Sequence, residues 1–102
     1  MKLQWTETAK NDLIAIRRYI AVDNSTAAKK WIERLKTKAR NIVHSPLAGR
    51  KVPELSRDDI REVIEGNYRI VYHVQSKGLS ILTIFESHRL FPTEDVAGQS
   101  ER

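Results

Sequence analysis

The spacing of the apolar residues changes once along this chain, near Ile60, and no other feature of the sequence constrains the fold as strongly. Before Ile60 the apolar residues recur every three or four positions, as they do along one face of an α-helix. After it, short alternating and β-branched runs are separated by the tight-turn sequences Gly66-Asn67 and Ser76-Lys77-Gly78. A helical first half followed by a β-rich second half predicts an α+β fold.

Two amphipathic helices are expected in the first half. The first follows Thr6, a residue type that caps helix N-termini, and the tripeptide DNS at positions 23–25 interrupts it. A second helix follows and ends before Pro46. Because the break is short, the helices should form an antiparallel hairpin. Their apolar stripes are Ala9, Leu13, Ile16 and Ile20 in the first helix, and Ala28, Trp31, Ile32, Leu35, Ala39, Ile42 and Val43 in the second.

The β-rich part is expected to supply three strands, at about 61–65, 68–75 and 79–87, and residues 2–5 (KLQW) a short first strand. The element order is then β-α-α-β-β-β. We expect the N-terminal helical hairpin to pack on one face of an antiparallel sheet, with the other face free to bind a partner. Residues 1–92 should form a single domain, and residues 93–102 a polar, flexible C-terminal tail.

The composition excludes several kinds of site. The chain has 102 residues and no cysteine, so it has neither disulfides nor a thiolate metal centre. The three histidines, His44, His73 and His88, do not share a metal-binding spacing, and no Gly-rich phosphate loop or serine nucleophile motif is present. We therefore expect no metal and no cofactor. No apolar segment has the length of a signal peptide or a membrane span, which favours a cytoplasmic protein with no membrane partner.

The net charge of +5 is unevenly distributed. Between Arg17 and Lys51, ten Lys and Arg residues face two acidic ones, giving +8, while the rest of the chain carries −3. Such a basic half suggests an anionic partner, which could be nucleic acid, the ribosome or an acidic protein segment. A solvated helix face rich in Lys and Arg explains the charge equally well at this stage.

Several groups of residues resemble toxins of the RelE/ParE superfamily, the toxic halves of bacterial toxin–antitoxin pairs, and ParE more than RelE. The resemblance covers roughly residues 3–90, and its most specific part is the IRE sequence followed by YRIVY. The matching residues are Trp5, Thr6, Ala9, Asp12, Leu13, Ile16 and Tyr19 in the first helix region, Ser45-Pro46 and Gly49-Arg50 after the hairpin, Ile60-Arg61-Glu62 and Tyr68-Arg69-Ile70-Val71-Tyr72 in the central strands, and Ser87-His88-Arg89 at the end.

The resemblance implies a growth-inhibiting toxin, of the kind that stabilises plasmids, which a cognate antitoxin protein neutralises. ParE-type toxins inhibit DNA gyrase and are not nucleases, and this is the expected function. RelE-type toxins enter the ribosome and cut mRNA, and a metal-independent endoribonuclease of that type is the alternative. The chain is thus an enzyme only under the alternative. A degenerate member that only binds its antitoxin is a third reading.

The resemblance also proposes site residues. Arg69 and Arg89 look like two arginines of RelE, and His88 occupies the position of a basic residue, so these three would be catalytic if the chain is RelE-like. Arg can stabilise a phosphorane because its charge is permanent. However, Leu90-Phe91-Pro92 replaces the terminal tyrosine region of RelE, and Val63 stands where RelE has another basic residue.

A second set of residues is expected to contact the target or the antitoxin. It consists of Arg50, Lys51, Arg61, Arg69, Tyr72 and His73. Structural roles are open for several of these side chains. Arg69 could pair with Glu62 across the hairpin, which is worth at most ~1 kcal/mol if the pair is exposed. Tyr72 could pack in the core, and His88 could simply be solvated.

Overall fold

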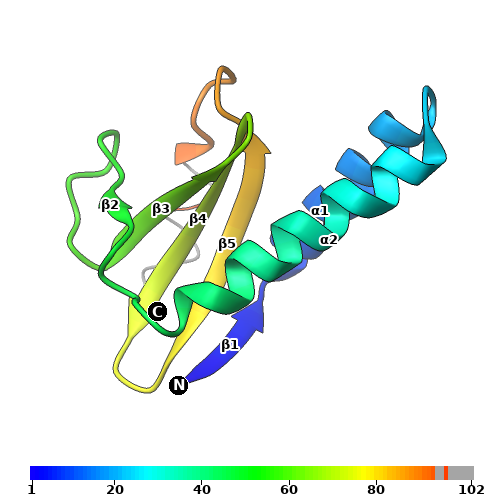
Figure 1. Cartoon of the computed structure of the whole chain (residues 1–102). Coiled ribbons are helices and arrows are strands. Elements are labelled where there is room, and N and C mark those ends of the chain that lie inside the picture. The colour runs from blue at the N-terminus through cyan, green and yellow to red at the C-terminus, as the bar shows by residue number, and fades with distance from the viewer. Residues whose placement is uncertain (94–95, 97–102) are drawn as a thin grey trace.

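The computed structural model describes residues 1–93 and 96, and it confirms the α+β class and the expected order of a helical hairpin followed by strands (Figure 1). Neither helix is both long and apolar enough to cross a membrane, within the residues described. The elements are β1 (Lys2–Trp5), α1 (Glu7–Ala21), α2 (Ser25–Ile42), β2 (Arg50–Lys51), β3 (Ile60–Glu65), β4 (Tyr68–Gln75) and β5 (Gly78–Glu86).

The strands form one sheet in the order β1-β5-β4-β3-β2. The pairs β2–β3, β3–β4 and β4–β5 are antiparallel, as expected, whereas β1 pairs parallel with β5, which makes the sheet mixed. A parallel pair requires a long connection, because a tight turn can join only antiparallel neighbours, and here two helices and three strands separate β1 from β5 in the chain. The short strand β2 was not anticipated from the sequence.

Polar side chains fasten α1 to the sheet. The Thr6 hydroxyl accepts the Ala9 backbone N–H as the expected N-cap, and it donates to the carbonyl oxygen of Leu82 in β5 at 2.9 Å. Nearly two turns later, the Asp12 carboxylate accepts a hydrogen bond from the Thr83 hydroxyl at 2.6 Å and another from the Ile84 backbone N–H at 3.0 Å. These bonds satisfy groups at an irregular place in the β4–β5 ladder and fix the helical hairpin over one face of the sheet.

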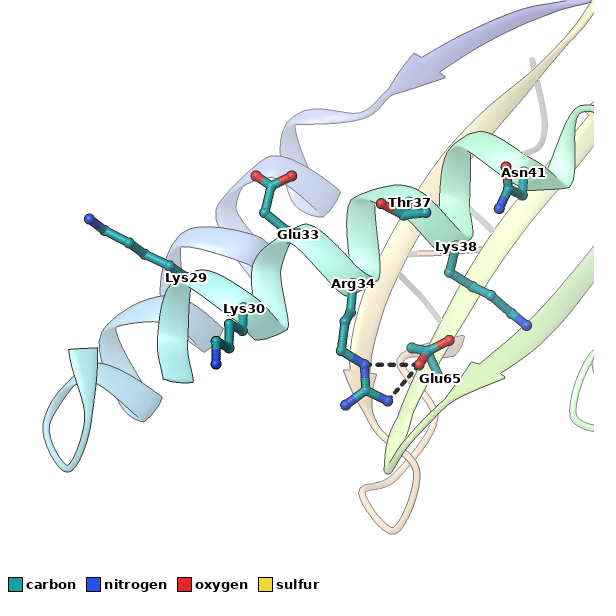
Figure 2. A pocket seen from close by; sticks show the side chains of 8 residues that line it. All are labelled: Lys29, Lys30, Glu33, Arg34, Thr37, Lys38, Asn41 and Glu65. Carbon is teal, nitrogen blue, oxygen red and sulfur yellow. Dashed lines mark hydrogen bonds and ion pairs between the residues drawn. The ribbon is translucent and has the colours of Figure 1, made fainter. Parts of the chain in front are cut away.

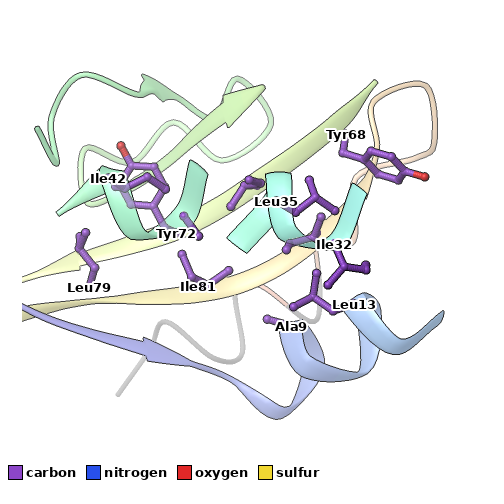
Figure 3. Packing of buried hydrophobic residues seen from close by; sticks show 12 residues of the cluster. Ala9, Leu13, Ile32, Leu35, Ile42, Tyr68, Tyr72, Leu79 and Ile81 are labelled. Atoms are coloured by element: carbon purple, nitrogen blue, oxygen red, sulfur yellow. The ribbon is translucent and has the colours of Figure 1, made fainter. Parts of the chain in front are cut away.

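The main core lies between this sheet face and the two helices (Figure 3). At its edge, the Trp31 ring packs edge-on against Tyr68, with ring centroids 5.4 Å apart. Gly66, in the β3–β4 turn, has a φ of +60° and leaves no room for a Cβ beside Trp31, so both conformation and space require glycine there. The buried members of the core are Ala9, Leu13, Ile32, Leu35, Ala39, Ile42, Tyr68, Ile70, Tyr72, Leu79, Ile81 and Ile84.

The other face of the sheet is covered, and the expectation of a free face is wrong there. A second apolar cluster forms because the segment around 52–59 and the segment after β5 fold back over it. Val96, in the expected tail, is fully buried in this cluster, and its N–H donates to the Pro92 carbonyl. The rest of that tail, 94–95 and 97–102, lies outside the described residues. The cluster consists of Val52, Ile60, Val71, Leu82, Phe85 and Val96, with Leu55 and Phe91 packed against it.

Candidate functional site

Arg69 lies at the centre of a buried charge network on the second face of the sheet. Its Nε donates to Glu62 Oε1 at 2.7 Å, and its terminal nitrogens donate to both carboxylate oxygens of Glu54 at 3.0 and 3.2 Å. The guanidinium carbon lies 5.1 Å from the ring centroids of both Phe85 and Phe91. The hydrogen bonds from Arg69 lower the pKa of Glu54 below its usual range, although burial acts in the opposite direction.

The pairing of Arg69 with Glu62 confirms the structural pair left open by the sequence, and because the pair is buried, the ~1 kcal/mol limit for an exposed pair does not apply. Arg69 is 6% exposed and Glu62 1%. Glu62 also accepts a hydrogen bond from the exposed Arg50. With two carboxylates on the Arg69 guanidinium, this part of the network has no net positive charge with which to attract a phosphate.

Three further residues of the expected binding set, Lys51, Arg61 and His73, make hydrogen bonds or ion pairs within or to the 46–59 segment. His73 Nε2 is 2.9 Å from Asp59 Oδ2, and Lys51 Nζ is 2.6 Å from Asp58 Oδ1. Arg61 donates to the carbonyl oxygen of Gly49 at 2.9 Å. The hydrogen bonds from Arg57 lower the pKa of Asp59, and burial opposes this effect.

Tyr72 lies on the opposite, helix-covered face. Its side chain is fully buried in the main core, and its hydroxyl donates to the carbonyl oxygen of Pro46 at 2.7 Å. Burial raises the pKa of this hydroxyl. The structure therefore gives Tyr72 a packing role, and of the expected binding set only Arg50, Lys51 and Arg61 reach the surface to a substantial degree.

The three residues expected for a nuclease differ in their surroundings, since Arg69 is buried whereas His88 and Arg89 are exposed. His88 and Arg89 lie exposed beyond the end of β5, where His88 Nε2 is 3.4 Å from Glu86 Oε2. Arg89 lines a cavity of about 330 Å³ beside Tyr19 of α1. No hydrogen bond or ion pair connects Arg69 with His88 or Arg89 in the part of the chain that the structure describes. The same part contains no group of three or more His, Asp or Glu residues that could hold a metal ion.

The sequence indicated a helix face rich in Lys and Arg, but it did not distinguish the two surfaces that the structure shows on α2. The first, which we call the apolar groove, has a volume of about 640 Å³ and lies between β1, α1 and α2. The sequence offered one indication of this groove, since Ile14 widens the apolar stripe of the first helix. In the structure the Ile14 side chain is 50% exposed. The groove is lined by the apolar residues Leu3, Trp5, Leu13, Ile14 and Ile32 and by the basic residues Lys10, Arg17, Lys36 and Arg40.

The second surface, which we call the basic trough, runs along the outward side of α2 and has a volume of about 670 Å³ (Figure 2). Arg34 is fixed there by hydrogen bonds to Glu65 Oε2, the shorter at 2.7 Å, and its guanidinium carbon lies 4.1 Å from the Trp31 ring centroid. The full lining is Lys29, Lys30, Glu33, Arg34, Thr37, Lys38, Asn41 and Glu65.

Comparison with solved structures identifies the fold. The chromosomal ParDE toxin–antitoxin system from P. aeruginosa matches with a TM-score of 0.70 and 24% identity, over 84% of this chain and 95% of that chain. The toxin–antitoxin complex RelBE2 from Mycobacterium tuberculosis matches with a TM-score of 0.62 and 18% identity, over 83% and 95%. A mutant of E. coli toxin RelE in the free state gives 0.66 and 16%, over 96% and 95%. The fold is therefore that of RelE/ParE-type toxins.

The family follows from the sequence. The model of the family described as "ParE toxin of type II toxin-antitoxin system, parDE" matches residues 3–91, which is nearly all of the described chain. The chain thus belongs to the ParE toxin family of type II toxin–antitoxin systems. A search of curated proteins finds no match.

Proposed function

We propose that this chain inhibits growth by acting on DNA gyrase in the cytoplasm, and that a cognate antitoxin neutralises it. Membership of the ParE family supports the toxin role, and ParE-type toxins, which the sequence resembles, act on gyrase. One of the similar structures is a ParDE toxin–antitoxin system, which supports an antitoxin partner. The alternative of a ribosome-dependent mRNA endonuclease would require a catalytic site on the same fold.

The burial of Arg69 is the observation that favours gyrase over mRNA. Metal-independent RNA cleavage requires a cation that stabilises the developing charge on the phosphorane. Arg69 is bound by Glu62 and Glu54 and lies against the rings of Phe85 and Phe91. A phosphate at this position would have to displace two carboxylates and both rings. A toxin that binds its target without cutting it fits this arrangement better.

Induction of the chain in growing cells tests the target. We expect DNA synthesis to fall first, with filamentation and induction of the DNA-damage response, while protein synthesis continues. Supercoiling by purified gyrase should also be inhibited by the purified chain. Translation that stops before DNA synthesis, together with ribosome-bound mRNA cut at defined codon positions, would instead establish the endonuclease.

The apolar groove is the surface we assign to the antitoxin. Its apolar floor offers anchor positions for a helix, and four basic residues at its rim favour acidic side chains on the segment that binds. We propose that an acidic, amphipathic antitoxin segment folds onto the groove when it binds. This assignment gives a role to part of the +8 charge between Arg17 and Lys51.

Two exposed β-branched residues, Ile14 of α1 and Val22 at the C-cap of the same helix, test this assignment. Ile14→Asp places a carboxylate in the groove and should weaken antitoxin binding at least ten-fold, because it desolvates a charge at an apolar contact. Val22→Asp is the matched control, since Val22 is 84% exposed at the end of the same helix and outside the groove. Binding is measured by co-purification and titration with the antitoxin expressed from the same operon. Equal affinities for the two variants would place the antitoxin elsewhere.

A further inference from the structure

The basic trough differs from the apolar groove in the chemistry of its lining, although both lie on α2. Every lining residue of the trough is charged or polar, and none offers the large apolar anchor that a protein or peptide partner needs. Interfaces with nucleic acid are instead polar and strongly basic. Lysine, arginine, threonine and asparagine, the residue types that dominate this lining, are those that contact phosphate oxygens.

The basic side chains of the trough form a row. Lys30, Arg34 and Lys38 are four positions apart and project from the same side of α2, whereas Glu33 points away from them (Figure 2). Residues eight positions apart lie about 12 Å apart along a helix axis, which is about the width of the major groove of B-DNA. A helix lying across that groove would therefore bring Lys30 and Lys38 to phosphates on facing strands.

The cations of the row are available to a ligand. Lys29, Lys30 and Lys38 have no ion-pair partner among the residues that the structure describes. Arg34 uses its Nε and one terminal nitrogen to bind Glu65, and its other terminal nitrogen makes no hydrogen bond within that part of the chain. The Arg34 guanidinium already occupies one face of the Trp31 ring, and that ring also packs edge-on against Tyr68, which disfavours Trp31 as a platform on which an unpaired base could stack.

We propose that the basic trough of α2 binds the phosphate backbone of double-stranded DNA without regard to sequence. Lys29, Lys30 and Lys38 neutralise phosphates, Arg34 is a pre-positioned donor, and Thr37 and Asn41 add neutral hydrogen bonds. This property is separate from the apolar groove and does not depend on gyrase as the target. It would hold the toxin close to whatever DNA-bound assembly it inhibits.

The test is the salt dependence of binding to a fluorescent 24-base-pair duplex of random sequence, followed by anisotropy between 50 and 200 mM NaCl. Each phosphate contact adds about 0.9 to the slope of log K against log salt concentration. The triple variant Lys29→Gln, Lys30→Gln, Lys38→Gln should therefore lower the magnitude of the slope by about 2 to 3. Since none of these lysines is ion-paired within the described structure, its melting temperature should match that of the parent chain.

The matched control removes the same charge elsewhere, in the variant Lys2→Gln, Arg18→Gln, Lys77→Gln. These residues are exposed and lie outside the trough, so the slope should change by less than about 1 because salt screens distant charges. Equal slopes for the two triple variants would overturn the proposal, as would the absence of duplex binding at 50 mM NaCl. Polyglutamate bound as tightly as the duplex would show that the trough takes an acidic protein instead. None of these three results would affect the tests of gyrase or of the apolar groove.

Discussion

The two faces of the sheet are closed in different ways. On the face under the helices, apolar side chains such as Ile70 and Ile81 meet the apolar stripes of α1 and α2. On the other face, Val71 and Phe85 share the surface with Arg69 and Glu62, which are almost as deeply buried. Neighbouring residues of the same strands thus lie in two different environments. On the helix-covered face the packing of apolar side chains is sufficient, whereas on the other face each buried charge also needs a partner.

This difference makes the second face less tolerant of single substitutions. An apolar core accepts volume-conserving exchanges at a cost usually below about 1.5 kcal/mol. A buried ion pair loses far more when one partner is removed, because the other charge stays in a poorly solvated place. Because each buried charge on the second face needs a partner, the pairing of Arg69 there supports a structural role for that residue.

The largest effect is expected for Glu62→Ala. It leaves Arg69 with only the partly exposed Glu54 as a partner, and the free energy of unfolding should fall by about 3–5 kcal/mol. Urea denaturation at pH 7 measures the loss. If the single variant does not fold, Glu62→Leu combined with Arg69→Met should, because replacing a buried pair by apolar residues is often neutral or stabilising. A loss below about 1 kcal/mol for Glu62→Ala would mean that water reaches Arg69 and that the two faces are alike.

Much of the fold could be predicted because its signals are local. Thr6 and the DNS sequence at 23–25 marked the helix starts, and Gly66-Asn67 marked the hairpin between β3 and β4. The parallel pairing of β1 with β5 joins residues more than seventy positions apart, and nothing local encodes it. The irregularity between Val71 and Tyr72 in the β4–β5 ladder was equally hidden.

The site was harder to predict, because burial depends on segments that are distant in sequence. Glu62 was considered as a partner of Arg69 across the hairpin, and the strand register places it diagonally opposite. The burial of this pair could not be predicted, because it depends on Phe91 and the segment around Glu54, which fold over that face. The apolar groove was missed for the same reason, since its walls come from β1, α1 and α2 together.

A smaller effect is expected for Phe91→Ala, which opens the cover of the second face without touching a charge. The Phe91 ring packs edge-on against Phe85 with centroids 5.7 Å apart and contacts the Arg69 guanidinium. Because the ring is only half-buried, its loss should lower the free energy of unfolding by about 1–2 kcal/mol. Leu90→Ala is the control, since Leu90 is 96% exposed and its truncation should change nothing measurable. Equal stabilities for the two variants would show that the segment after β5 does not hold the second face closed.

The smallest effect is a loss of stability in acid that belongs to the second face alone. Arg69 holds the pKa of Glu54 below its usual value of 4.5, so the folded state favours the ionised carboxylate. A lowered folded-state pKa contributes stability above the unfolded-state pKa, and this contribution disappears as the pH falls through the folded-state value. The free energy of unfolding should therefore decline below about pH 4.5. Since Glu54 is more than one third exposed, its share should not exceed ~1 kcal/mol. Urea denaturation from pH 6 to pH 3 should show a shallower decline for Glu54→Gln than for Glu33→Gln, which removes an exposed carboxylate from α2. Identical declines in the two variants would mean that Glu54 contributes nothing to the network around Arg69.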